Sequence, residues 1–532
     1  MTPGTRSSGM LEQSEPLRAK VTICGLPIHS REVLSPDSAI FASLHERQDF
    51  IQFARQLRGQ FAIVIEDGSR TVAITDFGCS RPIFYLRDVA GFKVSTKLAD
   101  LIGLSRKRMS KEALFFYASR NGIGISPFYS DIHELFPATV TFFDGERKES
   151  PSYLDWDDYL ETRPVKPADA EERLVEIASS YLRAIARSRG EIACLLSGGA
   201  DSALISWLLQ RIGLDGLSFT ADYAWKRYSE FAGASASAKA LGVHQERILI
   251  TAKTRRNAFL AINSERQNAP CANPQTPVMY ELARHAVDRG ITTLATGDHA
   301  DALFLGFDRF FRGFPTVTPA YSEAIAALGA QAKLGHLYSE PRRNSGYSEL
   351  LSIFGCTEDE RFAWDNRIYE SDCRDMSVFA ERAPLHTLQQ LDGQIWAGIS
   401  WQNTFLPVTQ AFDNSVEFVS PFYDIEMIKF AMSLPVEYKF RDGLTKALLR
   451  DIAHKILGRF IVKRASPNPS RVWRTLPDFR ERSLLPAYLR PLYDRLFFRN
   501  LVRSGQLWGS IDKIAALGIW LSGQPLVRTE TE

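Results

Sequence analysis

The chain has 532 residues, of which 45% are hydrophobic and 24% are charged, and its 64 Lys and Arg nearly balance its 62 Asp and Glu. This length exceeds what one hydrophobic core usually organises, so we expect at least two globular domains. A net charge of +2 gives no basic field of the kind that binds nucleic acid or a membrane surface, and we expect neither as a partner.

The cysteine and hydropathy patterns bear on location. Six cysteines stand singly along the chain, with no CxxC pair and no metal-ligand spacing, which fits reduced thiols in a cytoplasm. The first residues lack the apolar core of a signal peptide, and no later stretch approaches the roughly 18 apolar residues of a membrane span. We therefore expect a cytoplasmic protein with a disordered leader at residues 1–19.

Short β-type runs separated by turns fill the first part of the chain. They include KVTICGL, GQFAIVIEDGSRTVAITDFG, RPIFYLRD and ATVTFFDGERK. This pattern predicts a β-rich sandwich domain over residues 20–160. The polar stretch ETRPVKPADAEER follows at 161–173, and its two prolines and many charges predict a linker that runs into a helix.

Helices alternate with short apolar strands in the second part, residues 174–532. Examples in chain order are EIACLLS, SALISWLLQRI, GLSFTA, ERILI and ITTLATG. Such alternation predicts an α/β domain with a parallel sheet covered by helices on both faces. From about residue 324 to 449 helical periodicity dominates, which predicts a large helical region. The fold class is therefore α+β followed by α/β.

The turn SGGADS joins the predicted strand IACLL to the helix SALISWLL, at the sheet edge where such folds bind ligands. Gly198 and Gly199 allow backbone amides to approach an anion, and the helix N-terminus adds positive partial charge. The loop lacks the lysine of the GxxxxGK[ST] motif, which excludes a Walker-type nucleotidase, and Asp201 suggests a magnesium ligand. The alternative is an ordinary turn that Ser197 and Ser202 cap.

This turn resembles the pyrophosphate loop of ATP pyrophosphatases, which cleave ATP between the α- and β-phosphates. About a hundred residues later, TGDHADALFLGF resembles the G-E-G-x-D-E-L-F-G-G motif of asparagine synthetase B. Three further segments follow in the family's order: SPFYDIEMIKFAMSLPVEYK resembles its R-x-P-F-L-D helix, TKALLRDIA its K-x-x-L-R segment and IVKRAS its basic strand. The resemblance thus covers most of the second domain.

The resemblance implies ATP and Mg²⁺ as cofactors. The residues expected to hold the pyrophosphate are Ser197, Gly198, Gly199 and Ser202. Asp201 and Asp301 would ligate Mg²⁺, which offsets charge on the triphosphate. Lys446 would stabilise negative charge on the α-phosphate and on the tetrahedral intermediate, with an exposed helix lysine as the alternative.

The second motif departs from the family pattern beside its aspartate. Asp298 occupies the position of the motif's glutamate and could orient or deprotonate an attacking amine. His299 replaces a glycine, so either side chain could be the base, or neither. Tyr228, Ser229 and Glu230 resemble the family's acidic position after the second strand.

The first domain resembles the N-terminal-nucleophile glutaminase domain of asparagine synthetases through GQFAIVIED, ITDFGCSRPIFY and STKLADL. Glutamine hydrolysis in that family needs a cysteine at the mature N-terminus, whose free amine activates the thiol. Residue 2 is Thr2, so we expect an inactive glutaminase-like scaffold. The alternative is that removal of a 23-residue leader exposes Cys24.

Relatives that resemble this arrangement, the β-lactam and carbapenam synthetases and the lasso peptide macrolactam cyclases, take the amine from the substrate itself. We therefore expect an AMP- and PPi-forming synthetase that adenylates a peptide or small-molecule carboxylate and closes a ring. A lasso-type macrolactam cyclase in antibiotic biosynthesis, with a precursor-peptide protease as partner, is favoured by the arginine- and aromatic-rich stretch from about 308 to 404, which suits a peptide cleft. Those aromatics could instead form a core.

Other functions stay open to different degrees. A small-ring β-lactam-type synthetase and an ammonia-dependent asparagine synthetase-like amidotransferase both fit the same motifs. The charge balance and the cysteine spacing argue against a tRNA-modifying enzyme with this loop. A catalytically dead homologue is disfavoured because both motif aspartates and the lysine are present.

Overall fold

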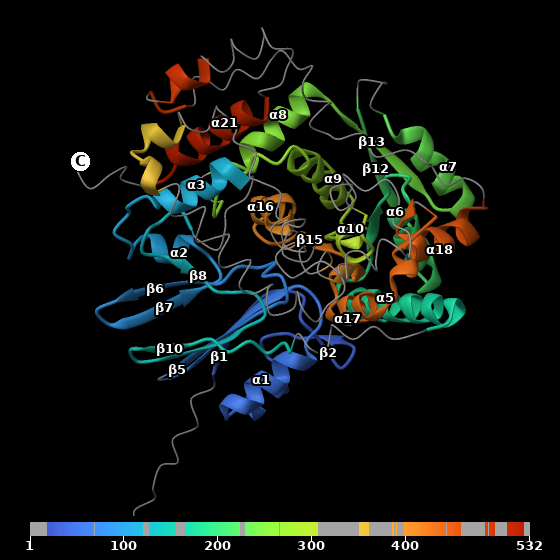
Figure 1. Ribbon diagram of the computed structural model, residues 1–532, viewed down its shortest axis with the longest axis horizontal. Coiled ribbons are helices and arrows are strands. Elements are labelled where there is room, and N and C mark those ends of the chain that lie inside the picture. The colour runs from blue at the N-terminus through green and yellow to red at the C-terminus, as the bar shows by residue number, and fades with distance from the viewer. Residues whose placement is uncertain are drawn as a thin grey trace, which may run out of the picture.

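The computed structural model describes residues 19–68, 70–120, 127–155, 165–223, 229–264, 267–306, 350–360, 386–387, 390, 398, 400–442, 444–458, 485–487, 489–494 and 508–525. The leader, most of the aromatic-rich stretch and the segment IVKRAS lie outside these residues. Figure 1 shows a β-rich first part, in blue, beside an α/β second part. Within the described ranges, every helix is too short or too polar to cross a bilayer.

Two antiparallel sheets form the first part. The larger has the strand order β1 (Lys20–Gly25), β4 (Phe61–Asp67), β5 (Arg70–Thr75), β9 (Val140–Asp144) and β10 (Arg147–Glu149). The smaller has the order β7 (Gly91–Ser95), β6 (Phe84–Asp88) and β8 (His133–Glu134), and a short hairpin pairs β2 (Ile28–His29) with β3 (Glu32–Val33). Helices η1 (Ala39–Ser43), α1 (Arg47–Gln56), α2 (Ala99–Ile102) and α3 (Lys111–Arg120) complete this part.

The alternation of side chains along β4 explains the sandwich. Ala62 and Val64 share a core with Ile83 and Leu135, which flank the smaller sheet. The intervening side chains, Ile63 among them, pack in a second core with α1 on the opposite face of the larger sheet. Because successive side chains of a strand point to opposite faces, one strand serves both cores.

The second part contains a wholly parallel sheet. Its strand order is β13 (Gln245–Ile250), β12 (Ser218–Tyr223), β11 (Ala193–Leu195), β14 (Thr293–Ala295) and β15 (Glu417–Val419). β11 comes first in the chain, the next two strands lie on one side of it, and the last two lie on the other. The sheet therefore has a topological switch point between β11 and β14, where ligands bind in folds of this kind.

Helices cover both faces of this sheet. One face packs against α5 (Pro167–Arg189), α6 (Ala200–Arg211), α17 (Ile425–Ser433) and α18 (Ala447–Leu457). The other packs against α9 (Thr276–Asp288) and α16 (Leu406–Ala411), while α7 (Phe231–Leu241) flanks β12 and α8 (Ala252–Ala261) contacts α9. The remaining elements are α10 (Ala300–Leu303), η4 (Pro421–Tyr423), η5 (Val436–Tyr438), β16 (Phe440–Arg441), β17 (Leu444–Thr445) and α21 (Trp508–Ser522).

Two sequence expectations need correction. Helix α5 begins at Pro167, inside the expected linker, because proline suits the first helical position and the preceding Lys166 is extended. The expected helical region contains the strand β15, whose three buried residues are too few to show an alternating pattern. The linker between the two parts is therefore shorter than the sequence predicts, and the parallel sheet has one more strand.

Charged side chains cross the boundary between the two parts. Arg81 of the first part forms an ion pair with Glu417 of β15, and both side chains are almost wholly buried. Arg58 donates to both carboxylate oxygens of Asp424, which precedes α17 and is fully buried, at 3.1 and 2.5 Å. Because an unpaired buried charge is costly, each part depends on the other for these partners.

This dependence predicts an unequal response to loss of one partner. Glu417→Ala should leave Arg81 buried without its carboxylate and should lower the free energy of unfolding by about 3–5 kcal/mol. Glu66→Ala, which removes an exposed ion pair with Lys20, should cost less than about 1 kcal/mol. Denaturant midpoints of the two variants test this, and equal losses would contradict the role given to the buried pair.

Candidate active site

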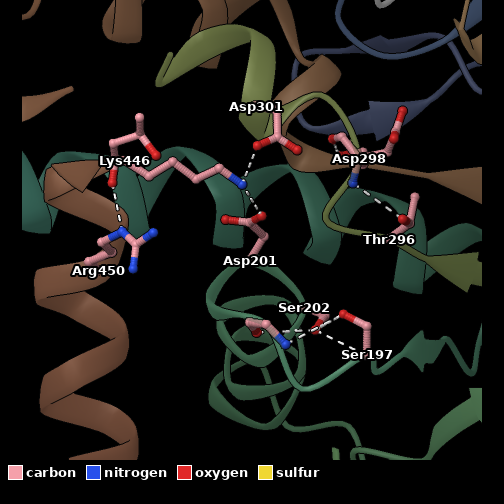
Figure 2. A network of polar contacts seen from close by, with 11 residues as sticks. Ser197, Asp201, Ser202, Thr296, Asp298, Asp301, Lys446 and Arg450 are labelled. Atoms are coloured by element: carbon pink, nitrogen blue, oxygen red, sulfur yellow. Dashed lines mark hydrogen bonds and ion pairs between the residues drawn. The ribbon is translucent and has the colours of Figure 1, made fainter. Parts of the chain in front are cut away.

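The loops that follow β11 and β14 meet at the switch point. Gly297 lies so close to the first turn of α6 that a Cβ atom there would sit 2.7 Å from Cβ of Asp201. Only glycine allows this approach, so the two sequence motifs are joined in space. Figure 2 shows the side chains that the two loops and α18 bring together.

The SGGADS loop is braced from inside by one hydroxyl group. The Ser197 amide donates to Oγ of Ser202 at 3.2 Å, and that hydroxyl donates in turn to the Gly199 carbonyl at 3.2 Å. Ser202 is buried, whereas Ser197 and Gly199 are exposed. Gly198 adopts φ +84° and packs against the backbone of Ala234. The loop is therefore a preformed turn whose outer surface and helix N-terminus face outward for an anion.

Lys446 is the centre of the charged cluster. Its Nζ lies 2.6 Å from Oδ2 of Asp201 and 2.5 Å from Oδ1 of Asp301 (Figure 2). The lysine side chain is only 14% exposed, and the residue precedes α18 with a left-handed φ of 57°. It is therefore a cluster residue and not the exposed helix lysine that the sequence left as an alternative.

The charge of Lys446 is fixed by its neighbours. Burial alone would lower the pKa of this ammonium group, but Asp201 and Asp301 together raise the pKa above its usual value. The ammonium form is thus held at neutral pH, and it neutralises part of the negative charge of two carboxylates that would otherwise repel each other.

The backbone around Asp301 is conformationally unusual. His299, Leu305 and Lys446 all have positive φ, at 76°, 56° and 57°, which costs non-glycine residues about 1–3 kcal/mol each. Gly306 is packed so closely that a Cβ atom there would lie 1.9 Å from Oδ1 of Asp301 and 2.2 Å from Cε of Lys446. The surrounding structure therefore forces these residues into place.

Asp298 and His299 differ in their surroundings. The Asp298 backbone is held through Oγ of Thr296 at 3.2 Å and Oγ of Ser420 at 2.7 Å. Burial, and then the nearby carboxylate of Asp301, raise the pKa of Asp298 to about 7. His299 is 4% exposed and packs edge to face against Tyr423, with ring centres 4.8 Å apart. A pKa near 7 suits Asp298 to proton transfer near neutrality.

Two of the remaining sequence candidates, Ser229 and Glu230, lie at the start of α7. Oγ of Ser229 accepts the amide of Phe231 at 3.3 Å, and Glu230 is the N-terminal flanking residue of α7. Tyr228 lies outside the described residues. The same helix contacts the SGGADS loop, since Gly198 packs against the backbone of Ala234.

The donor set fits a hard cation such as Mg²⁺. Oδ1 of Asp201 is buried and has no hydrogen-bond partner among the described residues. The carboxylates of Asp201 and Asp301 already enclose one positive group, the Lys446 ammonium. Carboxylate oxygens are preferred Mg²⁺ ligands, but within the described part of the chain no three acidic, His or Cys side chains converge, so phosphate and water would have to complete the shell.

Comparison with known proteins places the chain. The profile of the asparagine synthase family matches residues 178–522, which is more than half of its length. The chain belongs to the asparagine synthase family. It is 25% identical over 457 residues to the glutamine-hydrolyzing asparagine synthetase 1 of Bacillus subtilis, covering 79% of this chain and 69% of that protein.

Other similarities are more limited. A putative glutamine-hydrolyzing asparagine synthetase of Mycobacterium bovis is 25% identical over 307 residues, which cover 53% of this chain and 45% of the relative. The solved structure of the Bacillus subtilis glutamine phosphoribosylpyrophosphate amidotransferase covers 53% of this chain at 10% identity, with a TM-score of 0.19, and bears on no conclusion. Family membership supports an ATP-dependent carbon–nitrogen ligase of the asparagine synthetase type.

Sequence reasoning missed the residues that shape the cluster. Gly297 and Gly306 enforce the close approach of Asp201, Asp301 and Lys446, and Ser420 holds the Asp298 backbone. Both glycines stand inside the motif TGDHADALFLGF, so the signal was present, but its meaning depends on contacts with Asp201 and Lys446, which are distant in the sequence. Such contacts are not visible in a local pattern.

The raised pKa of Asp298 predicts a pH dependence of stability. The Asp298 carboxyl binds a proton more tightly in the folded protein, where its pKa is about 7, than in the unfolded chain, where the ordinary pKa is 3.8. Its contribution to the free energy of unfolding is therefore greatest below about pH 4 and is lost as the pH rises through about 7. In metal-free protein, Asp298→Asn should therefore be more stable relative to wild type at pH 8 than at pH 5. Thermal midpoints at the two pH values measure this, and an equal offset at both would refute it.

Proposed function

We propose that this protein activates a substrate carboxylate with ATP, releasing pyrophosphate, and then forms an amide by attack of an amine of the same molecule, as a peptide macrolactam cyclase does. The placement of Lys446 between Asp201 and Asp301, beside the SGGADS loop, carries the proposal. Two carboxylates, a buried ammonium group and a helix N-terminus are what a triphosphate and its cation require.

In the first half-reaction, a carboxylate oxygen bonds to the α-phosphorus and the bond to the β-phosphate oxygen breaks. Ser197, Gly198, Gly199 and Ser202 of the SGGADS loop would hold the departing pyrophosphate at the N-terminus of α6. Asp201 and Asp301 would hold Mg²⁺, which offsets charge on the leaving group when bound. Lys446, held at these carboxylates, would stabilise negative charge on the α-phosphate.

In the second half-reaction, the amine nitrogen attacks the acyl carbon and AMP leaves. Asp298 would accept the proton that the nitrogen loses as the carbon–nitrogen bond forms, since its pKa of about 7 suits that exchange. Lys446 would stabilise the oxyanion of the tetrahedral intermediate beside the α-phosphate. Confinement of amine and adenylate in one molecule replaces a second substrate by a high effective concentration.

The surroundings of Cys24 support an amine that does not come from glutamine hydrolysis. Cys24 lies within β1, where the four preceding residues, Lys20 to Ile23, pair with β4. Cleavage before Cys24 would remove most of that strand. Burial raises the pKa of the Cys24 thiol to about 11, so it is a poor nucleophile near neutrality.

The products of ATP test the proposal. With ATP and Mg²⁺, linear peptides that carry a free amine and an internal Asp or Glu should be dehydrated to rings, with one AMP and one PPi released for each. The small-ring and ammonia-dependent alternatives are tested by a short β-amino acid and by L-aspartate with ammonium chloride. Mass spectrometry and a pyrophosphate assay distinguish these outcomes, and release of ADP and phosphate would overturn the whole assignment.

Lys446→Met tests the second half-reaction separately. Loss of a fixed positive group beside a developing oxyanion should lower product formation about 10²–10³-fold. Exchange of labelled pyrophosphate into ATP, which reports adenylation alone, should fall much less. Lys446→Arg should restore little, because a planar guanidinium does not place one compact charge at the same point. Lys455→Met is the matched control, since Lys455 lies on α18, the helix that Lys446 precedes, and is 63% exposed. Ring closure within a few-fold of wild type in Lys446→Met would remove this role.

A further inference from the structure

A second polar pair, Lys439 and Gln390, takes no part in the chemistry proposed above. Lys439 and Gln390 are both fully buried. Nζ of Lys439 donates to Oε1 of Gln390 at 2.7 Å and to the carbonyl of Met432, at the end of α17, at 3.3 Å. Two fully buried polar side chains call for a physical reason.

The amide group of Gln390 extends this contact to the segment that carries Asp301. Its Nε2 donates to the Leu303 carbonyl in α10 at 2.6 Å and to the Ala431 carbonyl in α17 at 3.2 Å. Leu303 follows Asp301 by two residues on a helix of only four residues. So short a helix cannot hold its own position, and the Gln390 amide is one of its anchors.

The backbone of Lys439 extends the contact in the other direction, to Lys446. Its carbonyl accepts the amide of Ala447 at 3.3 Å, and the Lys446 amide donates to the Phe304 carbonyl at 3.1 Å. The segments of Asp301 and Lys446 are therefore linked directly, through Phe304, and indirectly, through Gln390 and Lys439. Two links fix a separation more firmly than one.

Burying the amine of Lys439 costs free energy that packing alone would not require. Burial lowers the pKa of Lys439 well below its usual value, and the exposed Glu437 offsets this only in part. A methionine would fill the volume without removing an amine from water. Its two hydrogen bonds, to Gln390 and to Met432, are what a methionine would not supply.

We propose that Lys439 is a positioning residue that acts through Lys446, by holding the Lys446 ammonium at the two carboxylates with Gln390 as its intermediary. This inference rests on the proposed role of Lys446 at the α-phosphate. It concerns a residue that touches neither ATP nor the reacting carboxylate. Its effect should therefore depend on the presence of Lys446.

A double-mutant cycle tests this dependence, with Mg²⁺ and α,β-methylene-ATP, which cannot be split between the α- and β-phosphates, as the probe. Lys439→Met should weaken binding of the analogue about tenfold in the wild-type background and less than about twofold in the Lys446→Met background. Gln390→Met should behave in the same way, and it serves if Lys439→Met does not fold. Lys455→Met, on the exposed face of α18, should leave the affinity unchanged in both backgrounds. Isothermal titration calorimetry supplies the four affinities.

The outcomes separate the two proposals. Equal weakening by Lys439→Met in both backgrounds would show a merely structural role and would overturn the inference, as would no weakening at all. Failure of the wild type to bind the analogue, or no effect of Lys446→Met, would instead count against the proposed function. In that case a crystal structure of nucleotide-free Lys439→Met tests the positioning role by itself. We expect Nζ of Lys446 to have left its 2.5 Å contact with Asp301. An unchanged contact would refute the inference.

Discussion

One ammonium group held between two carboxylates governs the arrangement of three distant segments. Asp201 lies at the start of α6, Asp301 lies in α10, and Lys446 is the residue before α18. Electrostatic attraction holds the three side chains together at the switch point of the parallel sheet. Without the lysine the two carboxylates would repel each other, and without the carboxylates the lysine would be buried unpaired. Each group is stable there only because the others are present.

The same balance of charge prepares the site for its ligand. Under the proposed function, the site would carry an excess of negative charge both before and after Mg²⁺ and a triphosphate bind. The Lys446 ammonium, fixed between the two carboxylates, would offset part of that charge in both states. The positive φ angles at His299, Leu305 and Lys446 lower the stability of the folded state, and the contacts of the charged cluster and its surroundings offset that loss.

Local patterns in the sequence were sufficient for some levels of the structure and not for others. The SGGADS turn, the strand before it and the helix after it could be predicted because glycine, helix N-terminus and apolar periodicity act over a few residues. The membership of Asp201, Asp301 and Lys446 in one site came from resemblance to a family. The strand β15 and the anchoring by Gln390 could not be predicted, because a three-residue strand and a tertiary hydrogen bond leave no periodic signal. The start of α5 did have a local signal in Pro167, which the charged, proline-containing stretch around it obscured. Sequence also left Lys446 open between a site residue and an exposed lysine, which only its burial decides.

The buried pairs between the two parts bear on how such a chain can change over generations. Side chains at the surface of the first part can be exchanged one at a time without touching these pairs. Deletion of that part, in contrast, would remove Arg81 and Arg58 in one event and leave the carboxylates of Glu417 and Asp424 without their cations. A lineage can therefore alter single residues of the first part and still has to retain its fold as a whole.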